Sequence, residues 1–334
     1  MHASPVLSLR DTGMDQDWVP ALPPGYNDTN RAFLQAFMAR GTLSLSEGQK
    51  LIAAIQSAST GEHISPSDIT RDVFQHYIHA ARQAIEPLDF DIRNTRDQLS
   101  GERIWAFVNA HSDPPTQLST VHTADEVAYI KRLLDAMFDK HNTPRIELMA
   151  IDEAEALRLS RPPAQSRQSG VGAGGDSDNL EVFGPKVQPL KHSEVLSLLS
   201  SLVQEGWLQL SPNGFYSLTT RALLELWQWL VEVYNDPEPE DNAWQPIKFC
   251  EGCKEIVTYG QRCDEPDCLV RLHDHCSEGF WRTRPDRRCP KCNREWSGNH
   301  YVGERALTTR AGWQRGRQRG GRRSEAQAED EDEE

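Results

Sequence analysis

All seven cysteines of this 334-residue chain lie between positions 250 and 292, and their spacing suits metal binding. They read Cys250-x2-Cys253-x9-Cys263-x4-Cys268, then His273-x2-Cys276, then Cys289-x2-Cys292. A two-residue gap lets one turn of chain present two soft ligands to the same tetrahedral ion. Eight ligands in four close pairs are enough for two four-ligand zinc sites with no open position. We therefore expect a cofactor of two zinc ions.

The rest of the sequence favours metal over disulfides as the use of these thiols. The first twenty residues contain Asp11, Asp15 and Asp17 and no apolar run, so we do not expect a signal peptide. No stretch approaches the roughly 18 consecutive apolar residues that a membrane helix needs. We expect an intracellular chain whose thiols stay reduced, with no membrane partner.

Length and charge suggest several domains and an acidic protein. A length of 334 residues favours two or three domains, and a hydrophobic content of 37% fits compact domains joined to disordered segments. The formal net charge is −14, but residues 248–323 carry an excess of Lys and Arg between acidic neighbours. A mildly basic patch is weak support for nucleic-acid binding, because a solvated basic face is commoner.

The N-terminal part reads as a winged-helix domain over residues 28–112, after a disordered lead-in over 1–27. A helical stripe at Phe33, Leu34, Phe37 and Met38 ends at Gly41, a second helix follows the capping-box pair Ser44 and Glu47, and a third runs between Pro66 and Pro87. Alternating apolar residues at 88–92 and 105–107 then flank a polar turn at 94–101. Three helices followed by a hairpin are typical of a winged helix.

The same order of elements recurs over residues 120–235. The expected elements are a capped helix from Thr123 to Phe138, an apolar stretch at 146–151 leading into a helix through Leu159, a helix over 191–206, a hairpin around Asn213-Gly214, and a final helix from about Thr219 to Tyr234. Residues 161–188 are rich in Pro, Gly, Ser and Gln, which predicts a disordered insertion. The sequence thus predicts two tandem winged helices.

The helix expected at 191–206 does not resemble a DNA-reading helix. It carries Glu194 and Glu205 and no arginine, whereas a helix in the DNA groove needs several Lys or Arg to neutralise phosphates. Its apolar and acidic composition favours docking on another protein. A linker over 236–247 then leads to the zinc domain at 248–298, so the predicted fold class is multidomain and mainly α with small β wings, ending in a small zinc-bound cross-brace domain.

Three families share the ligand order of four cysteines, one histidine and three cysteines, and three details favour a RING over a PHD finger. A PHD finger, a reader of histone tails, normally has an aromatic residue where this chain has Arg287. A RING favours Cys-Pro-x-Cys at the last pair, which Cys289-Pro290-Lys291-Cys292 supplies. A RING also has an aromatic after its sixth ligand, matched by Phe280 and Trp281.

In these families the ligand pairs interleave. We expect one ion on Cys250, Cys253, His273 and Cys276, and the other on Cys263, Cys268, Cys289 and Cys292; sequential pairing is the alternative. His275 is a further candidate ligand, although its position next to Cys276 makes sharing one ion awkward. The domain has few apolar residues, so zinc–ligand bonds should supply on the order of 10 kcal/mol of folding free energy per ion.

Three stretches of this sequence resemble the RING-like non-SMC element one subunits of the SMC-five/SMC-six genome-maintenance complex. They are IKFCEGCKEIVTYGQRC, CLVRLHDHCSEGFWRTRPDRRCPKC and the preceding QEGWLQLSPNGFYSLTTRALLELWQWL. The resemblance covers roughly residues 28–296. It implies a nuclear, chromatin-associated RING-type E3 ubiquitin ligase in DNA repair and recombination. It also implies a MAGE-family subunit and a kleisin subunit as partners.

The implied chemistry needs no catalytic nucleophile in this chain. A RING holds a ubiquitin-charged conjugating enzyme in a reactive pose, so the rate gain comes from orientation. Trp281 and Pro290 match RING positions that line the groove for the conjugating enzyme. Glu251 and Gly252, where an apolar residue is common, and Asn293, where a basic residue is common, depart from the pattern. A non-catalytic structural hub and a histone-tail reader therefore stay open as alternatives.

The C-terminal residues 299–334 are expected to form a disordered tail. Residues 313–323 (WQRGRQRGGRR) are an Arg/Gly tract, and the acidic SEAQAEDEDEE follows. The tract could contact nucleic acid through its five arginines, or it could be a solvated tail whose charge its acidic neighbours partly neutralise.

Overall fold

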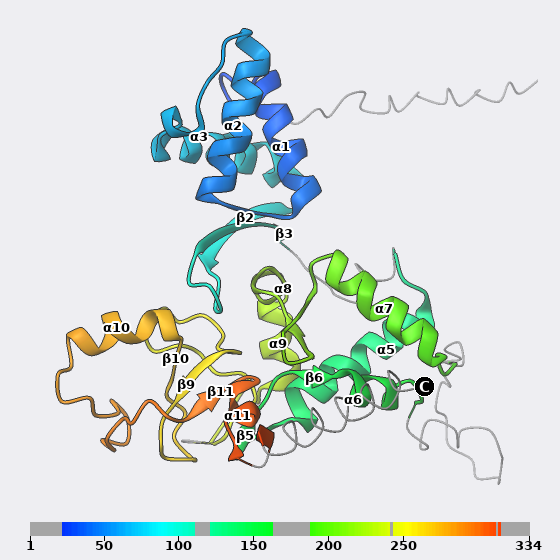
Figure 1. Ribbon diagram of the computed structural model, residues 1–334, viewed down its shortest axis with the longest axis vertical. Coiled ribbons are helices and arrows are strands. Elements are labelled where there is room, and N and C mark those ends of the chain that lie inside the picture. Colours follow the sequence, from blue (N-terminus) through cyan, green and yellow to red (C-terminus); the bar gives the residue numbers. More distant parts are fainter. Residues whose placement is uncertain (1–21, 111–120, 163–187, 241–242, 312, 315–334) are drawn as a thin grey trace, which may run out of the picture.

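The computed structural model describes residues 22–110, 121–162, 188–240, 243–311 and 313–314 (Figure 1). Most of the expected lead-in and insertion, and all of the tail beyond residue 314, lie outside the described residues. Among the described helices, none combines the length and the apolar composition needed to cross a lipid bilayer.

The N-terminal unit is a winged helix, as predicted. Its elements are α1 (Asp28–Arg40), β1 (Thr42–Ser44), α2 (Leu45–Thr60), η1 (Pro66–Asp68), α3 (Arg71–Ile85), η2 (Glu86–Leu88), β2 (Phe90–Arg96) and β3 (Arg103–Asn109). The antiparallel sheet has the order β1-β3-β2. The predicted capping box begins α2, because the Ser44 N–H donates to Glu47 Oε2 at 2.8 Å and the Glu47 N–H donates to Ser44 Oγ. Phe74 and Trp105 meet edge to face in the core.

The second unit repeats this architecture. Its elements are α5 (Ala124–Asp135), the π-helical turn η3 (Ala136–Lys140), β4 (Asn142–Thr143), β5 (Ile146–Glu147), β6 (Ile151–Asp152), α6 (Glu153–Arg158), α7 (His192–Gln204), β7 (Leu208–Leu210) and β8 (Phe215–Leu218). The sheet order β6-β8-β7 again places the third strand between the first and the second. The predicted tandem winged helices are therefore confirmed.

The helix expected from about Thr219 to Tyr234 is broken into α8 (Thr220–Glu225) and α9 (Trp227–Tyr234). The break lies at Leu226, which is buried. Arg93 from β2 donates its Nη1 hydrogen to the carbonyl oxygen of Leu224 at 3.2 Å. A side chain that donates to a helical carbonyl in this way interrupts the ladder of backbone hydrogen bonds. The sequence pattern could not predict the break because Arg93 comes from the other winged helix.

The C-terminal region, which we define as residues 248–311, is a small irregular unit. It contains β9 (Gly260–Arg262), β10 (Arg271–Leu272), α10 (Asp274–Arg282), β11 (Tyr301–Val302) and α11 (Arg305–Thr308), with the sheet order β10-β9-β11. Its apolar residues do not form a separate core: Val270, Leu272 and Trp296 belong to the same buried cluster as Leu199 and Leu218 of the second winged helix. The zinc region therefore folds against that winged helix.

The prediction of a disordered tail from residue 299 is wrong for residues 299–311. β11 pairs with β9, and the Val302 side chain is fully buried. The Arg305 guanidinium lies 4.4 Å from the ring centroids of both Tyr259 and Tyr301. A two-residue strand with one buried valine leaves no periodic pattern, so sequence periodicity could not predict it.

The segment between the second winged helix and the C-terminal region is held at both ends. Asn235 accepts a hydrogen bond from the Ile247 N–H at 2.8 Å and donates one to the Ile247 carbonyl at 3.0 Å. Ile247 is also buried in the shared core. These contacts fix the position of the chain shortly before Cys250, the first metal ligand.

Candidate metal centres

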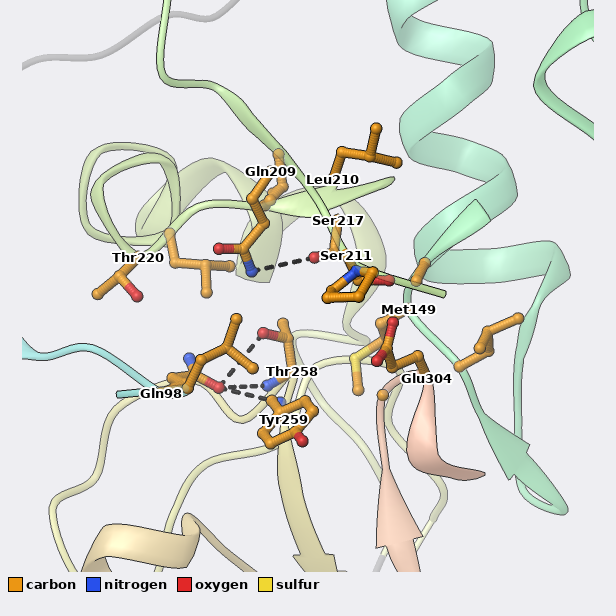
Figure 2. Close-up of a pocket in the computed structure, with 17 residues that line it drawn as sticks. Gln98, Met149, Gln209, Leu210, Ser211, Ser217, Thr220, Thr258, Tyr259 and Glu304 are labelled. Carbon is orange, nitrogen blue, oxygen red and sulfur yellow. Dashed lines mark hydrogen bonds between the residues drawn. The ribbon is translucent and has the colours of Figure 1, made fainter. Parts of the chain in front are cut away.

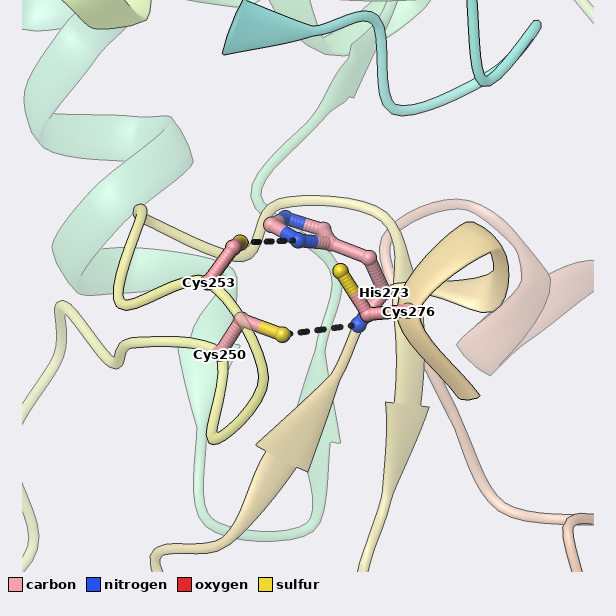
Figure 3. Close-up of side chains that lie close together, drawn as sticks. All are labelled: Cys250, Cys253, His273 and Cys276. Carbon is pink, nitrogen blue, oxygen red and sulfur yellow. Dashed lines mark hydrogen bonds between the residues drawn. The ribbon is translucent and has the colours of Figure 1, made fainter. Parts of the chain in front are cut away.

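The first ligand group contains the four residues expected from interleaved pairing (Figure 3). The ligand atoms of Cys250, Cys253, His273 and Cys276 all lie within 4.8 Å of one another. Cys253 Sγ is 3.3 Å from His273 Nδ1. For zinc at about 2.3 Å from sulfur and about 2.0 Å from nitrogen, tetrahedral ligands stand roughly 3.5 to 3.8 Å apart. The group thus has the dimensions of a closed zinc site.

The second group contains the four remaining cysteines, from two different ligand pairs. The Sγ atoms of Cys263, Cys268, Cys289 and Cys292 also lie within 4.8 Å of one another. Cys263 Sγ is 3.4 Å from Cys292 Sγ, and Cys268 Sγ is 3.5 Å from Cys289 Sγ. The structure therefore interleaves the pairs along the chain and excludes sequential pairing.

His273, and not His275, faces the first group. The Nε2 atom of His273 lies 3.1 Å from the carbonyl oxygen of Ile256, so its hydrogen belongs on Nε2 and Nδ1 is left as the ligand atom. The His275 ring stacks on the His273 ring with centroids 4.9 Å apart and lies outside the ligand group. The alternative ligand is thus not favoured by the geometry.

Tight turns shape the two Cys-x-x-Cys pairs. Lys254 and Asn293 follow these pairs with φ of 65° and 58°, and their N–H groups donate to the carbonyls of Cys250 and Cys289. A side chain at Gly252 would crowd the metal group, because a Cβ there would stand 3.0 Å from Cys276 Cβ. Two of the departures from the RING pattern, Gly252 and Asn293, thus have local structural reasons.

The pKa shifts of the clustered thiols also favour binding of a cation by each group. Hydrogen bonds with Cys253 and Cys276 hold the pKa of Cys250 far below its usual range, while the contacts with Cys250 and Cys253 raise the pKa of Cys276. In the second group burial raises the pKa of Cys268 to about 11. Because closely spaced thiols cannot all ionise alone, a bound cation is what allows four thiolates together. Sulfur and imidazole donors at these spacings fit Zn²⁺, so the two groups fit two zinc ions.

A buried cluster of charges fastens the second group to the second winged helix. Glu147 of β5 is 1% exposed and Arg271 of β10 is 0% exposed. Arg271 Nε donates to Glu147 Oε2 at 2.7 Å, and Arg271 Nη1 donates to the carbonyl of Cys268. Arg262 and Lys248 complete the cluster, with nitrogens 3.2 and 3.5 Å from Glu147 Oε1. Burial raises the pKa of Glu147, but the three cations outweigh it and the net shift is downward.

Sequence reasoning missed Glu147 and Gln98, which both join the C-terminal region to the winged helices. Glu147 is a charged residue inside a short apolar stretch, and this position is the signal by which it could have been found. Gln98 lies in the polar turn between β2 and β3, where glutamine has no distinguishing pattern.

The two residues predicted to contact a conjugating enzyme have different surroundings. Trp281 is 7% exposed, and it packs against Phe280 and Trp296 with ring centroids 4.9 and 5.4 Å away. Its edge lines a shallow groove of about 590 Å³ together with Glu278 and Arg282. Pro290 is exposed in the turn between Cys289 and Cys292. Of these two residues, Pro290 is exposed to solvent and Trp281 is largely buried.

Comparison with known proteins gives two family matches. Residues 30–226 match the family described as the Nse1 non-SMC component of the SMC5-6 complex, and residues 250–292 match a RING-like domain. The chain is 23% identical to the human non-structural maintenance of chromosomes element 1 homolog, over 80% of this chain and 84% of that protein. It is also 23% identical to the element 1 protein of Schizosaccharomyces pombe, over 84% of this chain and 96% of that protein.

A solved structure described as the Nse1-Nse3-Nse4 complex contains a chain of similar fold. The TM-score is 0.58 and the sequence identity is 21%, and the alignment covers 81% of this chain and 97% of that chain. The similarity of fold therefore extends over most of this chain.

Proposed function

This chain belongs to the family of Nse1 non-SMC components of the SMC5-6 complex, and from that premise we propose that it is a RING-type E3 ubiquitin ligase. The observation that carries the proposal is the interleaved pair of closed metal groups with a Cys-Pro-x-Cys turn that exposes Pro290. The conjugating enzyme would supply the thioester, and this chain would hold it in place.

The ligand groups act as a rigid support in this proposal. Because four residues fill each group, neither leaves a position for an activated water, and zinc supplies only structural cross-linking. Pro290 and the edge of Trp281 would contact the conjugating enzyme. Orientation of the thioester toward a substrate lysine then provides the rate gain.

Two features suggest that the activity depends on partners. Asn293 has an uncharged amide side chain, so it cannot act as a basic clamp on ubiquitin. Arg294 is engaged with Glu265 at 2.8 Å, although its side chain is 56% exposed. A partner that supplies or frees a basic group would raise the rate.

The partners in this proposal are a MAGE-family Nse3 subunit and an Nse4 kleisin. The fold similarity to a chain of the Nse1-Nse3-Nse4 complex supports them. Exposed apolar side chains of the second winged helix offer a surface for such contacts, namely Leu196, Trp227 and Val233 at 41%, 38% and 44% exposure. DNA repair and recombination in the nucleus, with association to chromatin, complete the proposed role.

Ubiquitin discharge from a charged conjugating enzyme tests the ligase proposal. The purified full chain, alone and with Nse3-like and Nse4-like subunits, should accelerate discharge to free lysine. Pro290→Ala should lower the rate several-fold, while Pro285→Ala, an exposed proline outside the ligand pairs, should not. Absence of acceleration in every combination would contradict ligase activity.

A second candidate, a non-catalytic hub, is supported by the burial of Trp281 and by the fastening of the zinc region to both winged helices. The hub predicts that cells carrying Pro290→Ala survive DNA damage as well as wild type. Cys276→Ser cells should be sensitive under either function, because the fold of the zinc region is lost. The match of residues 250–292 to a RING-like domain makes the histone-tail reader the weaker alternative.

A further inference from the structure

The first metal group lies beside the tip of a hairpin from the other end of the molecule. In Figure 1 the β2–β3 hairpin extends from the N-terminal helices toward the C-terminal region. We infer that Gln98, at the tip of this hairpin, is a positioning residue for the first zinc site, acting on His273 through the carbonyl of Ile256. The N-terminal winged helix thereby controls how firmly that ion is held.

The Gln98 amide is almost completely buried and makes bonds at both ends. Its Nε2 donates to the Ile256 carbonyl at 2.9 Å. Its Oε1 accepts from the backbone N–H groups of Thr258 and Tyr259, both at 3.0 Å (Figure 2). Gln98 is 8% exposed, so water does not replace these bonds easily. One side chain therefore fixes the backbone of the 256–259 loop.

The Ile256 carbonyl connects this loop to the metal ligand. It accepts from Gln98 Nε2 at 2.9 Å and also lies 3.1 Å from His273 Nε2. A carbonyl oxygen has two lone pairs, so it can accept both hydrogens. The bond to Nε2 keeps the hydrogen of the ring there and aims Nδ1 at the ligand group, where Cys253 Sγ is 3.3 Å away. Gln98 is thus two hydrogen bonds from the ligand atom.

The hairpin tip is rigid enough to place Gln98. Asp97 accepts from the N–H groups of Leu99 and Ser100 at 3.1 and 2.8 Å, and its second oxygen accepts from Thr220 Oγ1 of α8 at 2.9 Å. Gly101 closes the turn with φ of 70°. A Cβ at Gly101 would be 3.3 Å from His275 Cβ, so the turn rests on the start of α10. The tip is therefore held from both sides.

Docking of the hairpin and binding of the first ion are consequently linked. If docking of the hairpin through Gln98 makes the ion bind more tightly, then binding of the ion must make the hairpin dock more tightly by the same free energy, because linkage is reciprocal. The second group has no contact with Gln98 through these bonds; it is fastened by Arg271 instead. Loss of Gln98 should weaken one site and spare the other.

Release of zinc from the full-length protein to a chromophoric chelator tests the inference. Gln98→Ala should release one of the two ions several-fold faster than wild type, with the other ion unchanged; the effect should be smaller than the roughly 10–100-fold loss of affinity that follows removal of a direct partner of a metal-bound histidine, because Ile256 remains in place. Gln98→Glu keeps an acceptor for Thr258 and Tyr259 but cannot donate to Ile256, so it should also speed release. Gln209→Ala is the matched control, because Gln209 lines the same cavity as Gln98 and its side-chain amide donates to Ser217 Oγ at 3.1 Å, away from the metal ligands.

Cadmium NMR of the metal-substituted protein identifies which site responds, because three sulfurs with one nitrogen and four sulfurs give separate resonances. Gln98→Ala should shift or broaden only the resonance of the site with nitrogen. Three outcomes would overturn the inference: release accelerated equally at both sites, release unchanged at both sites, or a shift confined to the four-sulfur resonance. Far-UV circular dichroism should stay that of wild type, and a global loss of structure in both Gln98 variants would equally contradict a positioning role.

Discussion

Arg271 and Glu147 form a buried, two-pronged ion pair that joins strand β10 of the zinc region to strand β5 of the second winged helix. Arg271 Nε donates to Glu147 Oε2 at 2.7 Å, and Nη2 contacts the other carboxylate oxygen. The third nitrogen, Nη1, donates to the carbonyls of Cys268 and Val270. Arg271 thus spans from the interface to the backbone of a metal ligand.

Removal of Glu147 should destabilise the whole C-terminal half. Glu147→Ala leaves Arg271, Arg262 and Lys248 without their shared carboxylate, and removing one partner of a buried pair costs about 3–5 kcal/mol. Urea unfolding at neutral pH measures the loss. Glu102→Ala, an exposed glutamate, is the control and should change stability by less than about 0.5 kcal/mol. A loss for Glu147→Ala as small as that of the control would contradict the fastening role.

Interleaved pairing predicts which cysteine substitutions act alike. Cys263→Ser and Cys292→Ser belong to one group and should both lose the four-sulfur site, although they are far apart in sequence. Cobalt-substituted protein should then keep only the absorption of the site with nitrogen. Under sequential pairing the two variants would give different spectra, so agreement between them is the decisive result.

His273, which precedes α10, and His275, in its first turn, should behave differently although their rings stack. His273→Ala removes a ligand atom and should reduce the zinc content by one ion per chain, measured by elemental analysis. His275→Ala removes only a stacked ring and should keep both ions. Loss of zinc in His275→Ala with retention in His273→Ala would reverse the ligand assignment.

The ordered residues beyond 299 should be required for stability of the zinc region. Val302→Ala takes apolar atoms from a fully buried position and should cost about 1–3 kcal/mol. Truncation after Gly298 removes β11 and exposes the edge of β9, so its cost should be larger. Asn299→Ala, with an exposed side chain, serves as the control. Equal thermal stability of the truncated and full chains would show that β11 is dispensable.

Local patterns predicted most elements well because their signals lie within a few residues. The capping boxes at Ser44 and Thr123 begin α2 and α5, and the Asn213-Gly214 turn joins β7 to β8. The break at Leu226 and the strand at Tyr301 were missed because their causes, Arg93 and β9, come from elsewhere in the chain. The domain boundaries inferred from composition remain predictions, apart from the folded residues 299–311.

The eight metal ligands followed from the sequence alone, because soft ligand types at two-residue gaps leave few other uses for seven cysteines. Tertiary structure decided which ligands share an ion, which histidine faces it and how the zinc region is held. How the zinc region is held depends on Gln98 and Glu147, whose partners lie more than a hundred positions away. Contacts across such distances exist only after the chain has folded, so no local pattern of residues could specify them.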